Sequence, residues 1–293
     1  MQVVCAVATF DAEIIQMKYI LTIITGLLFS LSSSAQYYYN DVVANKISNN
    51  QQKILKQNKI RSVKAVSKEA DNTIVEGFSV EQKINSSATE IITTSKSTLG
   101  KASILTSSYA DGKIVKTNDE SDGVQTITEY VYDEIGLLKS VISSTIDTSM
   151  NSATSESHDW YYNTNGTPIK MIKIKNNTDT TVVQFVLDDK GFVGEEHWKR
   201  KGRNAESYYY YYNEAGLITD IVRYNSRVKK MLPDFVYEYD AAGRVKQMIQ
   251  VLAGGSNYNT WKYAYNENGL KQKETCYDKQ KQLVGVIEYI YNN

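Results

Sequence analysis

One seven-residue phrase recurs along this chain at a nearly constant spacing. It consists of an aromatic residue, any residue, a second aromatic residue, Asp or Asn, two further residues and Gly. Complete copies end at Gly136, Gly166, Gly216, Gly243 and Gly269, and a copy that lacks the second aromatic residue ends at Gly191. A fixed period is the sequence signature of a repeat architecture, so this phrase constrains the fold more than any other feature.

The spacing of the copies predicts the size of one repeat. A shortened copy ends at Gly112, and successive turn glycines from there to Gly269 lie 24 to 30 residues apart. About 25 residues hold two strands of about 8 to 10 residues and two turns, so each repeat is predicted to be one β-hairpin. The longest gap contains Ser143–Ser157, which is rich in Ser, Thr, Asp and Asn and is predicted to be a loose connecting loop.

The residues of the phrase have separate structural causes. Asp or Asn at the first turn position and Gly at the fourth are typical of a type I turn that ends in a left-handed residue. Gly adopts positive φ without a steric penalty. The two aromatic residues are two positions apart and therefore point to the same face of a strand. The use of Tyr rather than Phe indicates a partly wet face, where the hydroxyl reaches solvent or backbone.

The predicted fold class is all-β. Residues 71–293 are expected to form an antiparallel meander of about seven or more β-hairpin repeats, as an open twisted sheet or one that curls into two layers or a spiral. Residues 36–70 are expected to be a lead-in that is either disordered or a short helix around Val42–Gln57. In an open meander the last strand, at Tyr289–Tyr291, is an unpaired edge that could join another strand or chain.

The N-terminal residues carry an export signal. Lys18 precedes an apolar run of 13 residues, Tyr19–Leu31, and small residues lead to a predicted cleavage site before Gln36. The run is shorter than the roughly 20 apolar residues of a membrane span. Residues 17–35 are therefore predicted to be a signal peptide and residues 1–16 an upstream extension, with a retained anchor as the alternative. The mature chain is expected to have no transmembrane span and to reach the periplasm, the outer surface or the extracellular space.

Composition excludes some partners and frameworks. The chain carries 33 basic and 33 acidic side chains, and such a balance gives no long-range attraction to nucleic acid. Cys276 is the only cysteine after the predicted signal peptide, so no disulfide framework is expected. It is predicted to be a small buried apolar residue rather than a reactive thiol.

The phrase resembles the YD repeat of the bacterial RHS/YD-repeat family, in which Tyr-Asp or Tyr-Asn is followed after two residues by Gly. The resemblance covers about residues 103–293. It implies a strip of β-hairpins, which in large members spirals into a shell around a toxin domain. About seven hairpins are too few for such a shell, so the resemblance implies a small secreted member with an open twisted sheet.

Motifs for catalysis are missing from the sequence. His158 and His197 are the only histidines, lie in different repeats and have no zinc-ligand spacing or nucleophile elbow around them, so both are predicted to be structural. No P-loop or Rossmann fingerprint is found. The acidic groups at Asp119–Asp122 and Asp188–Asp189 fit turns better than a calcium site. We therefore predict a non-enzyme with no catalytic residue, cofactor or metal ligand.

Aromatic residues are the remaining functional clue. In the run Tyr208–Tyr212 both faces of one strand are aromatic, and large exposed apolar patches often mark binding sites. The candidate binding platform consists of Trp160, Trp198, Tyr209, Tyr211 and Trp261. Because the phrase itself is explained by folding, a site is expected in what varies between copies, such as His158, the five-tyrosine strand and Trp198.

These observations predict an exported, non-enzymatic β-repeat protein that acts in binding, in cell-envelope interaction or as a scaffold. Its partner is predicted to be an unidentified protein or glycan and not a nucleic acid. The alternative is a carbohydrate-binding or carbohydrate-active module that uses the Tyr and Trp platforms. A structural fragment without a ligand is a third possibility.

Overall fold

The Asp/Asn and Gly residues of the phrase build the turn between two strands. At Asn213, the backbone N–H donates to the carbonyl oxygen of Leu217, and the side-chain Oδ1 accepts the Leu217 N–H, both at 3.0 Å. Gly216 closes this turn with a φ of +74°, where a Cβ atom would lie 2.8 Å from the ring of Phe192. Glycine is therefore required here for its backbone conformation and for the room that it leaves.

In this computed structural model the described residues are 36–98, 102–225, 229–252 and 257–293. Residues Gln36–Asn293 form one compact unit. The predicted extension and signal peptide, residues 1–35, lie outside the described residues. One turn of π-helix, η2 (Tyr38–Val43), leads into the helix α2 (Ala44–Gln57).

Eighteen strands follow the helix in this unit. The strands are β1 (Ser62–Glu69), β2 (Ser79–Ile84), β3 (Glu90–Lys96), β4 (Ala102–Ala110), β5 (Lys113–Ser121), β6 (Val124–Tyr132), β7 (Leu138–Asp147), β8 (Ser152–Tyr162), β9 (Pro168–Lys175), β10 (Asp179–Leu187), β11 (Val193–Arg200), β12 (Arg203–Tyr212), β13 (Ile218–Asn225), β14 (Lys230–Tyr239), β15 (Val245–Val251), β16 (Tyr258–Tyr265), β17 (Lys271–Tyr277) and β18 (Leu283–Asn292).

The sheet is a closed antiparallel barrel, and the expectation of an open meander was wrong. Each strand pairs with the next one along the chain, and β1 pairs with both β18 and β2. The register of β1 against β18 runs from Ser62 opposite Asn292 to Glu69 opposite Gly285. The edge predicted at Tyr289–Tyr291 is therefore covered. The strand that closes the sheet comes from residues 36–70, which carry no copy of the phrase.

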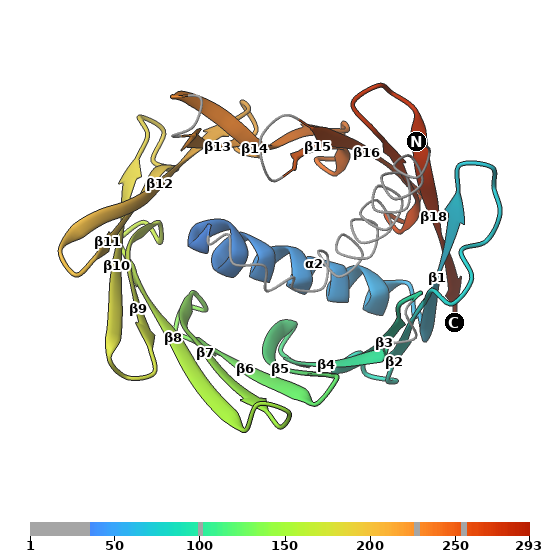
Figure 1. Cartoon of the computed structure of the whole chain (residues 1–293), viewed down its shortest axis with the longest axis horizontal. Helices are drawn as coiled ribbons and strands as arrows, with labels where there is room; N and C mark the ends of the chain where they lie inside the picture. The colour runs from blue at the N-terminus through green and yellow to red at the C-terminus, as the bar shows by residue number, and fades with distance from the viewer. Residues whose placement is uncertain (1–35, 99–101, 226–228, 253–256) are drawn as a thin grey trace, which may run out of the picture. The chain divides into compact units, whose positions relative to one another are not determined.

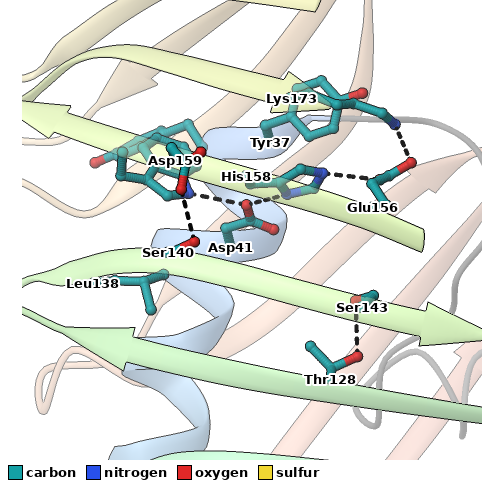
Figure 2. Close-up of polar contacts among 12 residues, drawn as sticks. Tyr37, Asp41, Thr128, Leu138, Ser140, Ser143, Glu156, His158, Asp159 and Lys173 are labelled. Atoms are coloured by element: carbon teal, nitrogen blue, oxygen red, sulfur yellow. Dashed lines mark hydrogen bonds and ion pairs between the residues drawn. The ribbon is translucent and has the colours of Figure 1, made fainter. Parts of the chain in front are cut away.

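The polar stretch Ser143–Ser157 is not a loop. It belongs to β7 and β8, which pair up to Asp147 opposite Ser152. Its hydroxyls form hydrogen bonds across β6 and β7, at 2.9 Å between Thr128 and Ser143 and at 3.0 Å between Thr126 and Thr145 (Figure 2 shows the first pair). Polar composition was misleading here because Thr is a good strand former and cross-strand hydroxyl pairs stabilise a sheet.

In six copies of the phrase, the second tyrosine connects its repeat to the one before it. Its hydroxyl donates to the backbone carbonyl two residues beyond the turn glycine of the preceding repeat, at 2.5–2.9 Å. The pairs are Tyr132 with Ile114, Tyr162 with Leu138, Tyr212 with Val193, Tyr239 with Ile218, Tyr265 with Val245 and Tyr291 with Lys271. This hydroxyl ladder explains why the position is Tyr rather than Phe.

The helix α2 lies within the ring of strands (Figure 1). Its polar face contacts the inner wall: Asn45 donates to the Tyr132 hydroxyl at 2.7 Å, and Gln52 donates to a carbonyl of the β2–β3 turn at 2.6 Å. Asn49 accepts the N–H of Ile114 at 2.8 Å. Asn45, Asn49 and Gln52 follow helical spacing and therefore share one face. The Asn- and Gln-rich lead-in thus contains the expected helix, and its amides bind polar groups of the barrel wall.

Candidate functional site

The inner wall of the barrel binds the N-terminal segment, which we define as Gln36–Val43. The central acceptor is Glu196 on β11, whose side chain is fully buried. Its Oε1 accepts the Tyr37 backbone N–H at 2.9 Å and the Trp198 indole N–H at 2.7 Å. Its Oε2 accepts the Tyr38 N–H at 3.2 Å and the Tyr210 hydroxyl at 2.6 Å. Burial raises the pKa of Glu196 to about 7, although these four hydrogen bonds oppose the rise.

A second group of charges holds the segment at Asp41. The Oδ2 of Asp41 lies 2.6 Å from Nδ1 of His158 and accepts the indole N–H of Trp160 at 3.1 Å (Figure 2). The other ring nitrogen of His158 lies 2.9 Å from Glu156, and Glu156 also pairs with Lys173 at 2.7 Å. The imidazole is thus held between two carboxylates, one from the N-terminal segment and one from β8.

This arrangement keeps His158 protonated at neutral pH. Burial by itself would lower the pKa of His158, but Asp41 and Glu156 outweigh it and raise the pKa to about 9. Burial by itself would raise the pKa of Glu156, but hydrogen bonds to His158 and Lys173 lower it to about 2. An imidazolium whose two N–H groups both contact carboxylates has no free nitrogen to accept a proton.

Aromatic contacts and one amide complete the binding of the segment. Tyr37 packs against Trp198 with ring centroids 4.6 Å apart, and Tyr38 packs edge-on against Tyr210 at 5.2 Å. The hydroxyls of Tyr39 and Tyr237 lie 3.0 Å apart. The Gln36 side chain donates to Asp234 at 3.1 Å, and Arg223 pairs with the same carboxylate at 2.9 Å. The segment therefore contacts β8, β9, β10, β11, β12 and β14 within a few residues.

The five residues of the predicted platform do not lie together. Trp160 and Trp261 are 4 % and 1 % exposed, and Trp198 is half-buried against Tyr37 inside the barrel. Tyr209 and Tyr211 alternate with the buried Tyr208 and Tyr210 and so lie on the outward face, where Tyr211 is 53 % exposed. Only this tyrosine pair is open to an external ligand.

The other residues singled out from the sequence, His197, Cys276 and Asp188, have surroundings that fit a structural role. His197 lies 2.6 Å from Glu195 and 2.8 Å from the Ser207 hydroxyl. Cys276 is buried, and burial raises its pKa to about 12, so the thiol stays protonated at neutral pH. Asp188 accepts two backbone N–H groups within its own turn. In the part of the chain that the structure describes, no group of three or more His, Cys, Asp and Glu side chains could hold a metal ion.

Glu196, Asp41 and Asp234 are the site residues that sequence reasoning missed. A signal for Glu196 was present: it lies five residues after a turn glycine, where four of the other five copies have an apolar residue. The same position holds Val141, Met171, Glu196, Ile221, Met248 and Glu274 in successive copies. A carboxylate at a repeat position that faces the core needs a partner, and this break in the series could have identified it.

Comparisons with known proteins give no family. No family model and no curated protein matches the chain. A porin-like protein from Bacteroides uniformis is similar in structure at 8 % identity, over 80 % of this chain and 96 % of that one, with a TM-score of 0.40. A porin-like protein from Bacteroides vulgatus is similar at 10 % identity, over 80 % and 98 % of the two chains, with a TM-score of 0.30.

A third similar structure is TcdB2-TccC3 without its hypervariable C-terminal region. It matches at 9 % identity over 72 % of this chain and 16 % of that chain, with a TM-score of 0.32. TM-scores this low carry no functional argument. Among the described residues, no helix is both long and apolar enough to cross a membrane.

Proposed function

We propose that this chain is an exported, non-enzymatic protein that serves as a binding or scaffold module at the cell envelope and keeps its own N-terminal segment bound inside its barrel. One observation carries the proposal: two buried titratable groups of the inner wall, Glu196 and His158, are occupied by that segment. Both oxygens of Glu196 accept backbone N–H groups from it, and His158 is paired with its Asp41.

The chemistry of these groups supports a role other than catalysis. A general base needs a free lone pair near its operating pH. His158 is protonated with both ring nitrogens engaged, and Glu196 already accepts four hydrogen bonds. The buried thiol of Cys276 stays neutral. His158 and Glu196 therefore fix the N-terminal segment.

A partner is expected on the outward face. Tyr211 is the most exposed tyrosine of the predicted platform, and Tyr161 presents its ring on the same side of the sheet with the Lys170 ammonium 4.1 Å from the ring centroid. Exposed tyrosines supply apolar area with a polar tip and are common at binding surfaces. The carbohydrate alternative is narrowed to Tyr209 and Tyr211, because Trp160 and Trp261 are buried.

We also propose that the phrase is a repeat of the YD type. The support is that six copies use the second tyrosine in the same way, as a hydroxyl donor to the preceding repeat. The copy with Leu187 at this position has no hydroxyl to donate. The same hydrogen bond in six copies is not expected of a chance run of Tyr and Asp.

Export is tested by expressing the whole chain in a bacterial host and sequencing the N-terminus of the product outside the cytoplasm. The proposal expects Gln36 or a neighbouring residue first. A product that stays in the cytoplasm with its leader contradicts it.

Binding is tested with a glycan panel and purified envelope fractions. The Tyr211→Ala variant is expected to lose binding, whereas Ile146→Ala, which removes a comparably exposed side chain on β7, keeps it. Equal binding by both variants contradicts a role for the tyrosine pair. Any substrate turnover that is lost in His158→Gln contradicts the non-enzymatic assignment.

A further inference from the structure

Glu196 is a buried carboxylate whose partners carry no positive charge. The donors that reach it within the described residues are two backbone amides, an indole and a phenol. At the same position of another repeat, Glu274 lies 2.8 Å from the ammonium of Lys271. Buried carboxylates are normally paired with a cation, because an uncompensated charge in a low-dielectric interior is costly. Glu196 therefore lacks the cation that its counterpart has.

Gln36, the residue that follows the predicted cleavage site, lies next to this carboxylate. Gln36 is only 3 % exposed, and its carbonyl oxygen already accepts the Asn40 N–H at 2.8 Å, so it sits in the first helical turn. The Tyr37 nitrogen is 2.9 Å from Glu196. Successive backbone nitrogens of a helical turn are about 3 Å apart, which places the Gln36 nitrogen within about 6 Å of the same oxygen. Asp234, which binds the Gln36 side chain, adds a second carboxylate nearby.

We propose that Glu196, supported by Asp234, is the binding site for the α-ammonium group that cleavage before Gln36 creates. The inference rests on the proposed export and processing of the chain. Hydrolysis of the Ala35–Gln36 bond consumes one water and gives a carboxylate on Ala35 and an amine on Gln36. This amine takes up a proton below its usual pKa of about 8. A neutral amide nitrogen thereby becomes a cation inside the barrel.

Processing then strengthens the hold of the barrel on its N-terminal segment. Two opposite charges a few ångströms apart in a dry interior attract far more strongly than in water. Burial raises the pKa of Glu196 and its neutral donors offset only part of that rise, whereas a nearby ammonium lowers the pKa further. The uncleaved chain carries the same hydrogen bonds without this charge pair, so its segment is bound more weakly.

The test compares two forms of the chain that both begin at Gln36, one with a free amine and one with an acetylated amine. Acetylation removes the positive charge with little change in length. We expect the equilibrium constant for folding at pH 7 to be about tenfold or more larger for the free-amine form than for the acetylated form. This corresponds to a pKa of Glu196 that is lower by one unit or more in the free-amine form. Denaturant unfolding measures the first quantity, and carbon-13 NMR titration of the glutamate carboxyls measures the second.

Glu196→Gln is expected to abolish the difference between the two forms, whereas Glu274→Gln, a change at the same repeat position, keeps it. Equal stability and equal Glu196 titration in the two parent forms overturn the inference, as does a difference that survives Glu196→Gln. The parent comparison by NMR stands even where Glu196→Gln does not fold.

Cyclisation of Gln36, in which the amine attacks the side-chain amide and expels ammonia, would remove the charge. Intact mass is therefore checked before each measurement, and Gln36→Ala, which cannot cyclise, repeats the comparison. An exported product that begins at another residue contradicts the proposed cleavage site. The comparison of free and acetylated chains that are made to begin at Gln36 does not depend on the natural cleavage site, so it tests the role of Glu196 separately.

Discussion

Glu196 and Glu274 occupy the same position in two repeats, five residues after a turn glycine, yet the two carboxylates have different partners. Both side chains are almost fully buried. Glu274 accepts the Lys271 ammonium at 2.8 Å and the Tyr289 hydroxyl at 2.7 Å, both from its own or the adjacent strand. Glu196 instead accepts two amides from a segment 158 and 159 residues away in the sequence.

One repeat position can therefore serve either local stability or the attachment of a distant segment. Two residues after the turn glycine, the copy of Glu274 has Lys271 and the copy of Glu196 has Val193. With a lysine, the carboxylate is neutralised within its hairpin. In the repeat that has Val193 instead of a lysine, the Glu196 carboxylate accepts hydrogen bonds from the N-terminal segment.

The largest effect is expected from Glu196→Ala. It leaves four donors without an acceptor, and each buried unsatisfied donor costs about 1–3 kcal/mol, so we expect a loss of about 4 kcal/mol or more in the free energy of unfolding. Urea unfolding measures this loss, and amide exchange at Tyr37 and Tyr38 should show that the segment is released. In Glu274→Ala the loss should be about 2 kcal/mol with both amides still protected. Release of the segment in both variants would contradict the comparison.

The next effect is a dependence on pH in the chain with an acetylated Gln36 amine. The native pKa of Glu196 is raised from 4.5 to about 7, so the native state holds this proton more tightly than the unfolded chain. Its contribution is full below about pH 4.5 and is lost as the pH rises through 7. The parent chain should therefore lose about 3 kcal/mol more than Glu196→Gln between pH 4.5 and 8.

His158 adds a separate slope at higher pH. Its native pKa is raised from 6.5 to about 9, so its contribution is full below pH 6.5 and is lost as the pH rises through 9. This slope should persist in Glu196→Gln and in Glu274→Gln. Parallel stability curves of the parent chain and Glu196→Gln from pH 4.5 to 8 would show that Glu196 does not titrate as described.

Lys271→Val places a valine two residues after the turn glycine in the repeat that contains Glu274. Val193 has this place in the repeat that contains Glu196. The substitution removes the cation from a buried carboxylate, and we expect a loss of about 3 kcal/mol at pH 7 that is partly recovered near pH 5, where the carboxylate takes up a proton. Denaturant unfolding at the two pH values measures it. Amides of Tyr37 and Tyr38 should stay protected, since the N-terminal segment does not contact this position. Unchanged stability at pH 7 would mean that Glu274 does not need its lysine.

The smallest effect should be the same in both copies. Tyr212→Phe and Tyr291→Phe each remove one hydroxyl of the ladder, to Val193 and to Lys271 respectively. Each should cost about 1 kcal/mol, the typical value of one hydrogen bond. Thermal unfolding of the two variants compares them directly. A difference of more than about 1 kcal/mol between them would show that the ladder is not uniform around the barrel.

The repeat itself was readable from sequence because its causes are local. Asp or Asn and Gly act within the same turn, and the aromatic pair shares a face by the alternation of a strand, so the hairpins and their aromatic side could be predicted. The closing of the sheet could not, because Ser62–Glu69 resembles no copy of the phrase and meets its partner Asn292 across 230 residues. The helix was one of two alternatives for the lead-in, beside disorder, and the role of Asn45 and Gln52 depends on a hydroxyl and a carbonyl group of the wall.

The site divides in the same way. His158 and Trp198 were singled out because they vary between copies, and both contact the N-terminal segment or its acceptor. Glu196 was missed, although it interrupts an apolar series, because its partners Tyr37 and Tyr38 lie far away in the sequence.

The period, the turn chemistry and the aromatic face could thus be predicted from local patterns, since these depend on residues within a few positions of one another. The closure of the sheet and the binding of the N-terminal segment by Glu196 became visible in the folded chain alone. Both depend on which distant groups come within hydrogen-bonding distance of a strand edge or of a buried charge. The residues next to the closing strand and next to Glu196 do not specify these distant partners.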